Sequence, residues 1–208
     1  MTRLPRAQRE RQLLDAARAQ FAARGYARVT MDEVAAAVGV TKPLLYTYFG
    51  NKEQLYLACM EPAAEALTAA VLAAVERAGT PAEALHGGVH AFFAFVDEER
   101  GAWRILFDDT LPAGGEVARR VAAHRERLTA LIAGTQRARL PDTPPERVDA
   151  LAVALLGAAE ALARWWLRTE AMRAEEAAEL LVRTLAPGLR VDPERPAASS
   201  VARRRSIT

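Results

Sequence analysis

The sequence predicts an all-α protein of about nine helices. Apolar residues recur at spacings of three and four along most of the 208-residue chain, which is the spacing of one helix face. Stretches with the strict apolar–polar alternation of half-buried strands are absent from the sequence. Residues that favour helix N-caps also precede several apolar segments. With 51% apolar and 26% charged residues, the chain can bury a sizeable core.

Three short helices are expected at the front of the chain. The first runs from about residue 5 to Arg24, with Gly25 as its terminator. The second begins at Thr30, because Thr30 and Glu33 have the spacing of a capping box. Gly39 then permits a sharp turn, and a third helix follows over residues 41–48 with Thr41 as its N-cap.

The later helices are longer. A fourth is expected from Asn51 to about residue 78, with a kink or break at Pro62. The pattern Thr-Pro-x-Glu starts one helix at Thr80 and another at Thr143. Between them lies a loop over residues 108–116 and a helix over 116–139. The helix that starts at Thr143 is expected to run over residues 145–169, and a last helix over residues 174–185.

Charge divides the chain into three parts. Residues 1–52 hold nine basic and four acidic residues, a net charge of +5, whereas residues 53–186 hold 14 and 20, a net charge of −6. The end of the chain is basic again, and we expect residues 189–208 to be a disordered tail. A basic front on an acidic body suggests a polyanion partner for residues 1–52 and a separate role for residues 53–188. Charge alone fits a solvated, Arg-rich helix better, so the partner has to be argued from the motifs that follow.

The composition also excludes several classes of protein. The single cysteine, Cys59, allows no intramolecular disulfide, and the first residues contain no apolar stretch typical of a signal peptide. The most apolar run, residues 150–167, contains Glu160 and Arg164, so we expect a buried helix and no membrane contact. These observations predict a cytoplasmic protein.

The helix over residues 41–48 has an unusual outer surface. A helical wheel places Leu45 and Phe49 on the face that packs inward. The opposite face and the two flanks form the outer surface, which holds Lys42, Pro43, Leu44, Tyr46, Thr47 and Tyr48. This layout is a helix-turn-helix, in which flanking donors hold phosphates and the outer pole meets base edges of double-stranded DNA. The alternative is that Tyr46 and Tyr48 are half-buried packing residues.

A longer motif supports the DNA-binding interpretation. The segment "FAARGYARVTMDEVAAAVGVTKPLLYTYFGNKEQLYLACM", residues 21–60, resembles the DNA-binding domain of the TetR family of bacterial transcriptional repressors. By matching position, the resemblance implies DNA contacts at Thr30, Thr41, Lys42, Pro43, Leu44, Tyr46, Tyr48 and Lys52. It further implies a helical C-terminal domain that forms a homodimer and binds a small effector molecule.

A dimer seam is expected on the last two helices. Apolar residues follow one another at alternating spacings of three and four, as in a coiled-coil seam. The expected interface residues are Val148, Leu151, Leu155, Ala158, Leu162, Trp165, Leu181 and Leu185. Periodicity cannot distinguish this seam from intramolecular core, so both interpretations stay open.

The effector is expected among the aromatic side chains of the body. Phe93, Trp103, Phe107 and Trp166 are the candidate lining residues for a hydrophobic or planar ligand. His86 and His90 have a metal-ligand spacing, but no His-Glu-x-x-His motif is present, so no metal site and no cofactor are expected.

The sequence therefore predicts a ligand-responsive transcriptional repressor that a small hydrophobic effector releases from its operator. No catalytic constellation is visible, and we expect no enzyme activity. Two alternatives remain: a regulator of the same kind without an effector, and a helical small-molecule-binding protein or enzyme with a vestigial DNA-binding domain.

Overall fold

The fold is an array of α-helices. The computed structural model describes residues 5–137 and 140–186, and within these residues there are nine helices and no strand. The helices are α1 (Arg6–Arg24), α2 (Met31–Ala37), α3 (Lys42–Phe49), α4 (Lys52–Glu76), α5 (Pro81–Glu98), α6 (Arg100–Leu106), α7 (Gly115–Arg137), α8 (Pro145–Thr169) and α9 (Ala174–Leu185). The expected tail, residues 189–208, lies outside the described residues.

Local capping signals set three of the helix starts. Thr30 forms the expected capping box with Glu33, and Thr80 forms one with Glu83. Asn51 caps α4, because its side-chain oxygen accepts a hydrogen bond from the backbone N–H of Gln54 at 2.9 Å. These three starts agree with the sequence.

Two other caps differ from expectation. Thr41 occupies the N-cap position of α3 but its side chain makes no capping hydrogen bond. The expected box at Thr143 and Glu146 does not form, because Pro144 takes the N-cap position and α8 begins at Pro145. Pro145 is pre-organised for the first helical position, which moves the N-cap from Thr143 to Pro144, while the helix spans residues 145–169 as expected.

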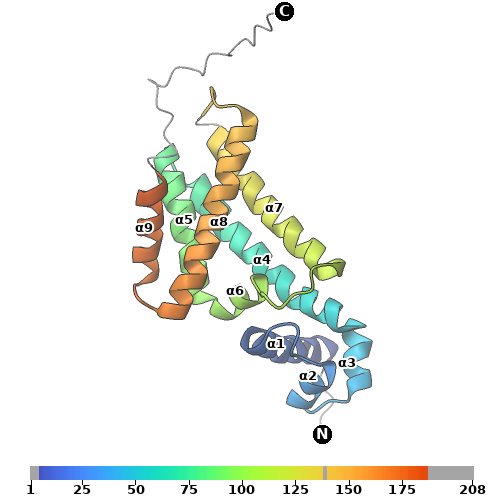
Figure 1. Ribbon diagram of the computed structural model, residues 1–208. Coiled ribbons are helices and arrows are strands. Elements are labelled where there is room, and N and C mark those ends of the chain that lie inside the picture. Colours follow the sequence, from blue (N-terminus) through green and yellow to red (C-terminus); the bar gives the residue numbers. More distant parts are fainter. Residues whose placement is uncertain (1–4, 138–139, 187–208) are drawn as a thin grey trace, which may run out of the picture.

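The helices form a small head and a larger body (Figure 1). Helices α1, α2 and α3 gather at one end, and α5, α7, α8 and α9 gather at the other, with α6 facing α1 between them. Helix α4 runs from the head into the body and packs on α1, α5, α6 and α7. A continuous buried core therefore extends from Leu13 and Phe21 of the head to the body.

Helix α4 is the element shared by head and body. Pro62 lies inside it on its exposed side, and the helix continues through this residue, so the break that the sequence allowed does not occur. Helices α4 and α8 are long and apolar enough to cross a membrane by length and composition alone. Core helices of soluble proteins can have the same length and composition, and both helices pack here against other helices of the bundle.

Candidate functional site

Helix α3 presents the outer surface that the helical wheel predicted. Leu45 and Phe49 are buried in the core, and α3 packs on α2 and α4, so the orientation of the short helix is fixed. Pro43, Leu44 and Thr47 are exposed on the opposite side, and the Tyr46 side chain is 41% exposed. An exposed apolar pole on a charged head is the kind of surface that enters the major groove of DNA.

Basic residues flank this pole. The Lys42 ammonium lies 2.9 Å from an Asp32 carboxylate oxygen and 6.0 Å from the centre of the Tyr46 ring. The pair with Asp32 raises the pKa of Lys42, so this side chain is a stable cation. Tyr48 is half-buried beside Phe49, and the Arg6 guanidinium lies 5.5 Å from its ring centre. Arg6 thus adds a cation to this edge that the sequence motif did not include.

The remaining predicted DNA contacts differ in how free they are. The Thr30 hydroxyl is engaged in the capping box, where it lies 2.8 Å from a Glu33 carboxylate oxygen. Lys52 leans over the Tyr26 ring at 4.2 Å, and partial burial lowers the pKa of its ammonium group. Thr41 is exposed at the N-terminus of α3. The head therefore offers Lys42, Thr41 and the outer pole more readily than Thr30 and Lys52.

A polar cluster ties the head to the body. One Asp108 carboxylate oxygen accepts a hydrogen bond from the backbone N–H of Tyr26 at 2.5 Å, and the Thr110 hydroxyl accepts one from Ala27 at 3.2 Å. The buried Tyr56 hydroxyl donates to the Ile105 carbonyl at 2.5 Å, and burial raises the pKa of this phenol strongly. The sequence analysis placed Asp108 in a loop, as observed, but gave no sign that this loop holds the end of α1.

A narrow apolar cavity of about 50 Å³ lies between α4, α5, α7 and α8. Its walls are mostly aliphatic, with Val71 and Val75 from α4 and Leu155, Leu156 and Ala159 from α8. The aromatic ring in its wall belongs to Phe92, and Thr135 and Gln136 supply the polar atoms. Apolar walls with a few polar groups are typical of ligand sites between helices.

The four predicted ligand residues lie elsewhere. Phe93, Trp103 and Trp166 are buried, and none of the four lines the apolar cavity. Trp103 and Phe107 stack with their ring centres 3.8 Å apart, and both line a separate, more open pocket of about 410 Å³ between the head and the body. Sequence analysis chose these residues because apolar aromatic side chains commonly line ligand pockets. Phe93 and Trp166 fill the core, and the apolar cavity forms where smaller residues leave space, so the effector contacts of the four stay a prediction.

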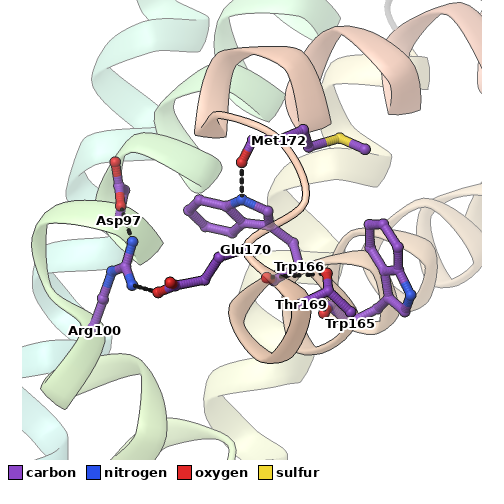
Figure 2. Close-up of polar contacts among 7 residues, drawn as sticks. All are labelled: Asp97, Arg100, Trp165, Trp166, Thr169, Glu170 and Met172. Atoms are coloured by element: carbon purple, nitrogen blue, oxygen red, sulfur yellow. Dashed lines mark hydrogen bonds and ion pairs between the residues drawn. The ribbon is translucent and has the colours of Figure 1, made fainter.

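Trp166 has a structural contact instead. Its indole N–H donates to the Met172 carbonyl at 2.7 Å and so fastens the turn between α8 and α9 (Figure 2). Arg100 lies over the same indole at 5.7 Å and pairs with Asp97 at 2.9 Å and with Glu170 at 2.7 Å. Figure 2 also shows Trp165 on the other side of α8, away from this contact.

The predicted dimer-interface residues coincide only in part with the residues that α8 and α9 expose. Val148, Leu155 and Leu181 are buried within the chain, which corrects their assignment to a dimer interface. Leu151, Ala158, Leu162 and Leu185 are half-buried, and Trp165 is 38% exposed. The exposed face instead carries Val153, which is 60% exposed, together with Ala154, Gly157, Ala161 and Leu180.

Comparison with known proteins agrees with this architecture. The family model for bacterial regulatory proteins of the tetR family matches residues 13–59, and the model for tetracyclin repressor-like C-terminal domains matches residues 81–188. The transcriptional activator FasR of Mycolicibacterium smegmatis is 33% identical over 168 residues, which cover 81% of this chain and 76% of FasR. The regulator BetI of Rhizobium meliloti is 30% identical over 151 residues, covering 71% of this chain and 74% of BetI.

Solved structures show the same fold. A TetR-like regulator from Rhodococcus sp. RHA1 has a TM-score of 0.74 and 32% identity, covering 90% of this chain and 98% of its own. AibR, solved with isovaleryl coenzyme A and operator DNA, has a TM-score of 0.71 and 26% identity, covering 86% of this chain and 98% of AibR. The fold and these matches define a helical transcriptional regulator with a helix-turn-helix head. The chain belongs to the TetR family.

Proposed function

We propose that this regulator is a cytoplasmic homodimer that binds an operator through α3 and releases it when a small apolar effector occupies the body. In this proposal residues 1–52 are the DNA-reading domain and residues 53–188 the effector and dimerisation domain. The observation that carries it is the exposed apolar pole of α3 flanked by Lys42, with Leu45 and Phe49 anchoring the helix beneath it. AibR, a related structure, was solved with both operator DNA and an acyl coenzyme A.

The DNA contacts divide into two groups. Pro43, Leu44 and Thr47 would meet base edges, where apolar groups distinguish thymine by its methyl group. Lys42, Tyr46, Tyr48, Thr41 and Lys52 would hold phosphates, with Thr30 contributing at the start of α2. The exposed pair between Lys42 and Asp32 is weak in water, so a phosphate can displace Asp32 at little cost.

A matched pair of variants tests the DNA-binding surface. Lys42→Ala should weaken operator binding and reduce the slope of log K against log salt by about 1, because one phosphate contact is lost. Asp32→Ala removes only the competing carboxylate, so it should leave binding equal or tighter. The measurement is fluorescence anisotropy with a genomic fragment recovered by footprinting of the purified protein. Equal salt slopes for the wild type and Lys42→Ala would refute this surface.

Tyr46→Ala should weaken binding more than Leu72→Ala, which removes an exposed apolar side chain from α4 far along the chain from α3. Circular dichroism of both variants verifies that they fold. If the two variants bind operator equally well, Tyr46 is a surface residue without a DNA contact.

The effector is proposed to place an apolar group in the cavity between α4, α5, α7 and α8. Its volume of about 50 Å³ is far below the roughly 300–1,000 Å³ of drug-sized ligand sites, so the walls must separate to admit a ligand. That requirement links binding to a movement of α4, which leads to the head. A ligand shifts the regulator only if it binds the widened state more tightly.

Isovaleryl coenzyme A and straight-chain acyl coenzymes A are suitable probes. They should raise the unfolding temperature of the wild type and lower its operator affinity. Ala159→Leu fills the cavity wall and should abolish both responses while preserving operator binding. If no probe changes the unfolding temperature or the operator affinity of either the wild type or Ala159→Leu, the result supports the alternative, a TetR regulator without an effector.

Dimerisation is proposed through the outer face of α8 and α9. Small residues at Ala154, Gly157 and Ala161 would let a partner helix approach closely, with Val153 and Trp165 packing beside them. Gly157→Glu should convert the dimer to a monomer, as measured by sedimentation. Gly134→Glu is the matched control, because Gly134 is also an open helical position but lies on α7.

Repression and activation by such a protein depend on where the operator lies relative to the promoter. A reporter placed downstream of the footprinted site measures the direction, and we propose repression. The relative FasR is named an activator, so induction by the unliganded protein would reverse this part of the proposal and leave the DNA-binding surface intact.

A further inference from the structure

Two histidines of α5 and one glutamate of α9 converge at the contact between these helices. His86 Nε2 lies 3.4 Å from Glu179 Oε2, and His90 Nε2 lies 3.8 Å from the same oxygen. The two imidazole rings stack with their centres 4.1 Å apart and their planes 22° apart. The ligand atoms of all three residues therefore lie within 4.8 Å of one another.

These separations match the edges of a transition-metal site. A tetrahedral Zn²⁺ ion with bonds of about 2.0–2.1 Å places neighbouring ligand atoms about 3.3–3.4 Å apart. The His86–Glu179 distance of 3.4 Å matches this edge, and the His90–Glu179 distance of 3.8 Å exceeds it by a few tenths of an ångström. Because an ion lies in the plane of each imidazole that binds it and the two stacked rings are only 22° from parallel, the rings must rotate when the ion binds. Histidines separated by four residues on one helix face are a recurrent zinc-ligand pair.

The surroundings also favour an ion over a simple ion pair. His90 Nε2 is buried and has no hydrogen-bond partner among the described residues, since 3.8 Å is too long for a hydrogen bond to Glu179. A buried nitrogen without a partner costs free energy, and metal coordination would remove that cost. The second Glu179 oxygen lies 3.6 Å from the Arg183 guanidinium, an ion-pair distance that leaves Oε2 to face the two histidines.

We propose that His86, His90 and Glu179 bind one divalent transition-metal ion of the zinc class. Two imidazoles and one carboxylate supply three ligands, and water or an exogenous group takes the fourth position. Calcium and magnesium are disfavoured, because they prefer oxygen ligands.

The ion would join α9 to the helix that forms one wall of the cavity. Residues Leu85, Gly88, Val89 and Phe92 of α5 line the cavity, so the two histidines occupy the other side of the same helix. The metal site stands independently of operator binding and of the effector, because it rests only on residues of α5 and α9.

The chain suits a direct binding experiment. It contains three histidines and one cysteine, and that cysteine, Cys59, is buried. Full-length protein without an affinity tag, stripped with a chelator, is titrated with Co²⁺ and then with Zn²⁺. We expect visible cobalt absorption bands typical of low coordination number at one ion per chain, and their loss when Zn²⁺ displaces Co²⁺.

Three variants and one control decide the assignment. His86→Ala, His90→Ala and Glu179→Gln should each weaken Zn²⁺ binding at least tenfold in calorimetry, because each removes a ligand. His124→Ala is the matched control, since His124 lies on α7 outside this cluster, and it should bind Zn²⁺ like the wild type. His86 is the most exposed of the three ligands, so its variant keeps the test valid if His90→Ala fails to fold.

A second readout is the unfolding temperature. Saturating Zn²⁺ should raise it in the wild type and in His124→Ala, and not in the three ligand variants. Zn²⁺ binding that is equal in the wild type and the ligand variants, or cobalt spectra of a purely octahedral aqueous ion, would overturn the proposal.

Discussion

Of the three glycines in the head, Gly25, Gly39 and Gly50, Gly25 is the one at which an added methyl group would meet neighbouring atoms. Its backbone has φ +76° and ψ 164°, a conformation that is essentially restricted to glycine. A Cβ atom built at this position would lie 2.7 Å from the Thr110 hydroxyl oxygen and 3.0 Å from the Thr110 methyl carbon. Gly25→Ala therefore combines backbone strain with a steric clash against the loop that holds the end of α1.

The two effects can be given magnitudes. An unfavourable backbone conformation costs about 1–3 kcal/mol. Inserting a methyl group into a well-packed contact costs about 1–3 kcal/mol more. We therefore expect Gly25→Ala to lower the free energy of unfolding by about 2–6 kcal/mol. In a Thr110→Ala background the nearest clashing atoms are absent, so the same substitution should cost only about 1–3 kcal/mol.

Urea denaturation followed by circular dichroism measures all four members of this cycle. Gly134→Ala is the matched control, because Gly134 lies in an exposed helical position with open space around its Cβ. It should stabilise the protein by about 0.5–1 kcal/mol through helix propensity. A loss below about 1 kcal/mol for Gly25→Ala, or the same loss with and without Thr110, would refute the reasoning.

Three further predictions concern buried or shifted groups. Arg125→Met should lower the free energy of unfolding by about 2–3 kcal/mol in urea denaturation, because Glu160 is only 1% exposed and Arg125 is its ion-pair partner. The double variant Arg125→Met, Glu160→Leu should recover most of that loss, because it leaves no unpaired buried charge. Burial raises the pKa of Cys59 to about 12, so the native thiol should react with a disulfide reagent on the order of 100-fold more slowly than the denatured thiol. Burial, with help from Arg127, lowers the pKa of His124, so the unfolded chain takes up a proton first as pH falls below about 6.5. The free energy of unfolding should then decrease from pH 6.5 downward, and calorimetry of His124→Gln should show a smaller decrease.

The helix starts were predictable because their causes are local. Thr30 and Glu33, like Thr80 and Glu83, stand three residues apart and satisfy each other's backbone and side-chain groups, so the sequence alone contains the whole interaction. The Thr143 start failed because two successive prolines compete for the same position, and the sequence pattern did not rank them.

The sites were less predictable because they depend on distant segments. Helix α8 is apolar over much of its circumference, so periodicity located an apolar stripe but could not tell that Leu155 faces the core while Val153 faces outward. The cavity exists because side chains from four helices leave a space unfilled, and no single residue in the sequence indicates such a space. Glu179 lies near His90 although the two residues are 89 positions apart in the sequence, and no local pattern relates them.

The energetics of the cavity restrict how an effector can work. Filling an existing apolar void is worth about 24 cal/mol per Å³, so filling about 50 Å³ yields only about 1.2 kcal/mol. Moving a two-state equilibrium from 1:99 to 99:1 requires about 5.5 kcal/mol of differential binding. The effector must therefore gain most of its preference from contacts that form only after the walls separate. Val71 of α4 lies in that wall, and Tyr56, 15 residues earlier and about 22 Å away along the helix, contacts the head through Tyr26. In the proposed mechanism, a displacement of α4 at the cavity would reach the head through one continuous helix, so effectors that only fill the void should bind without releasing the operator.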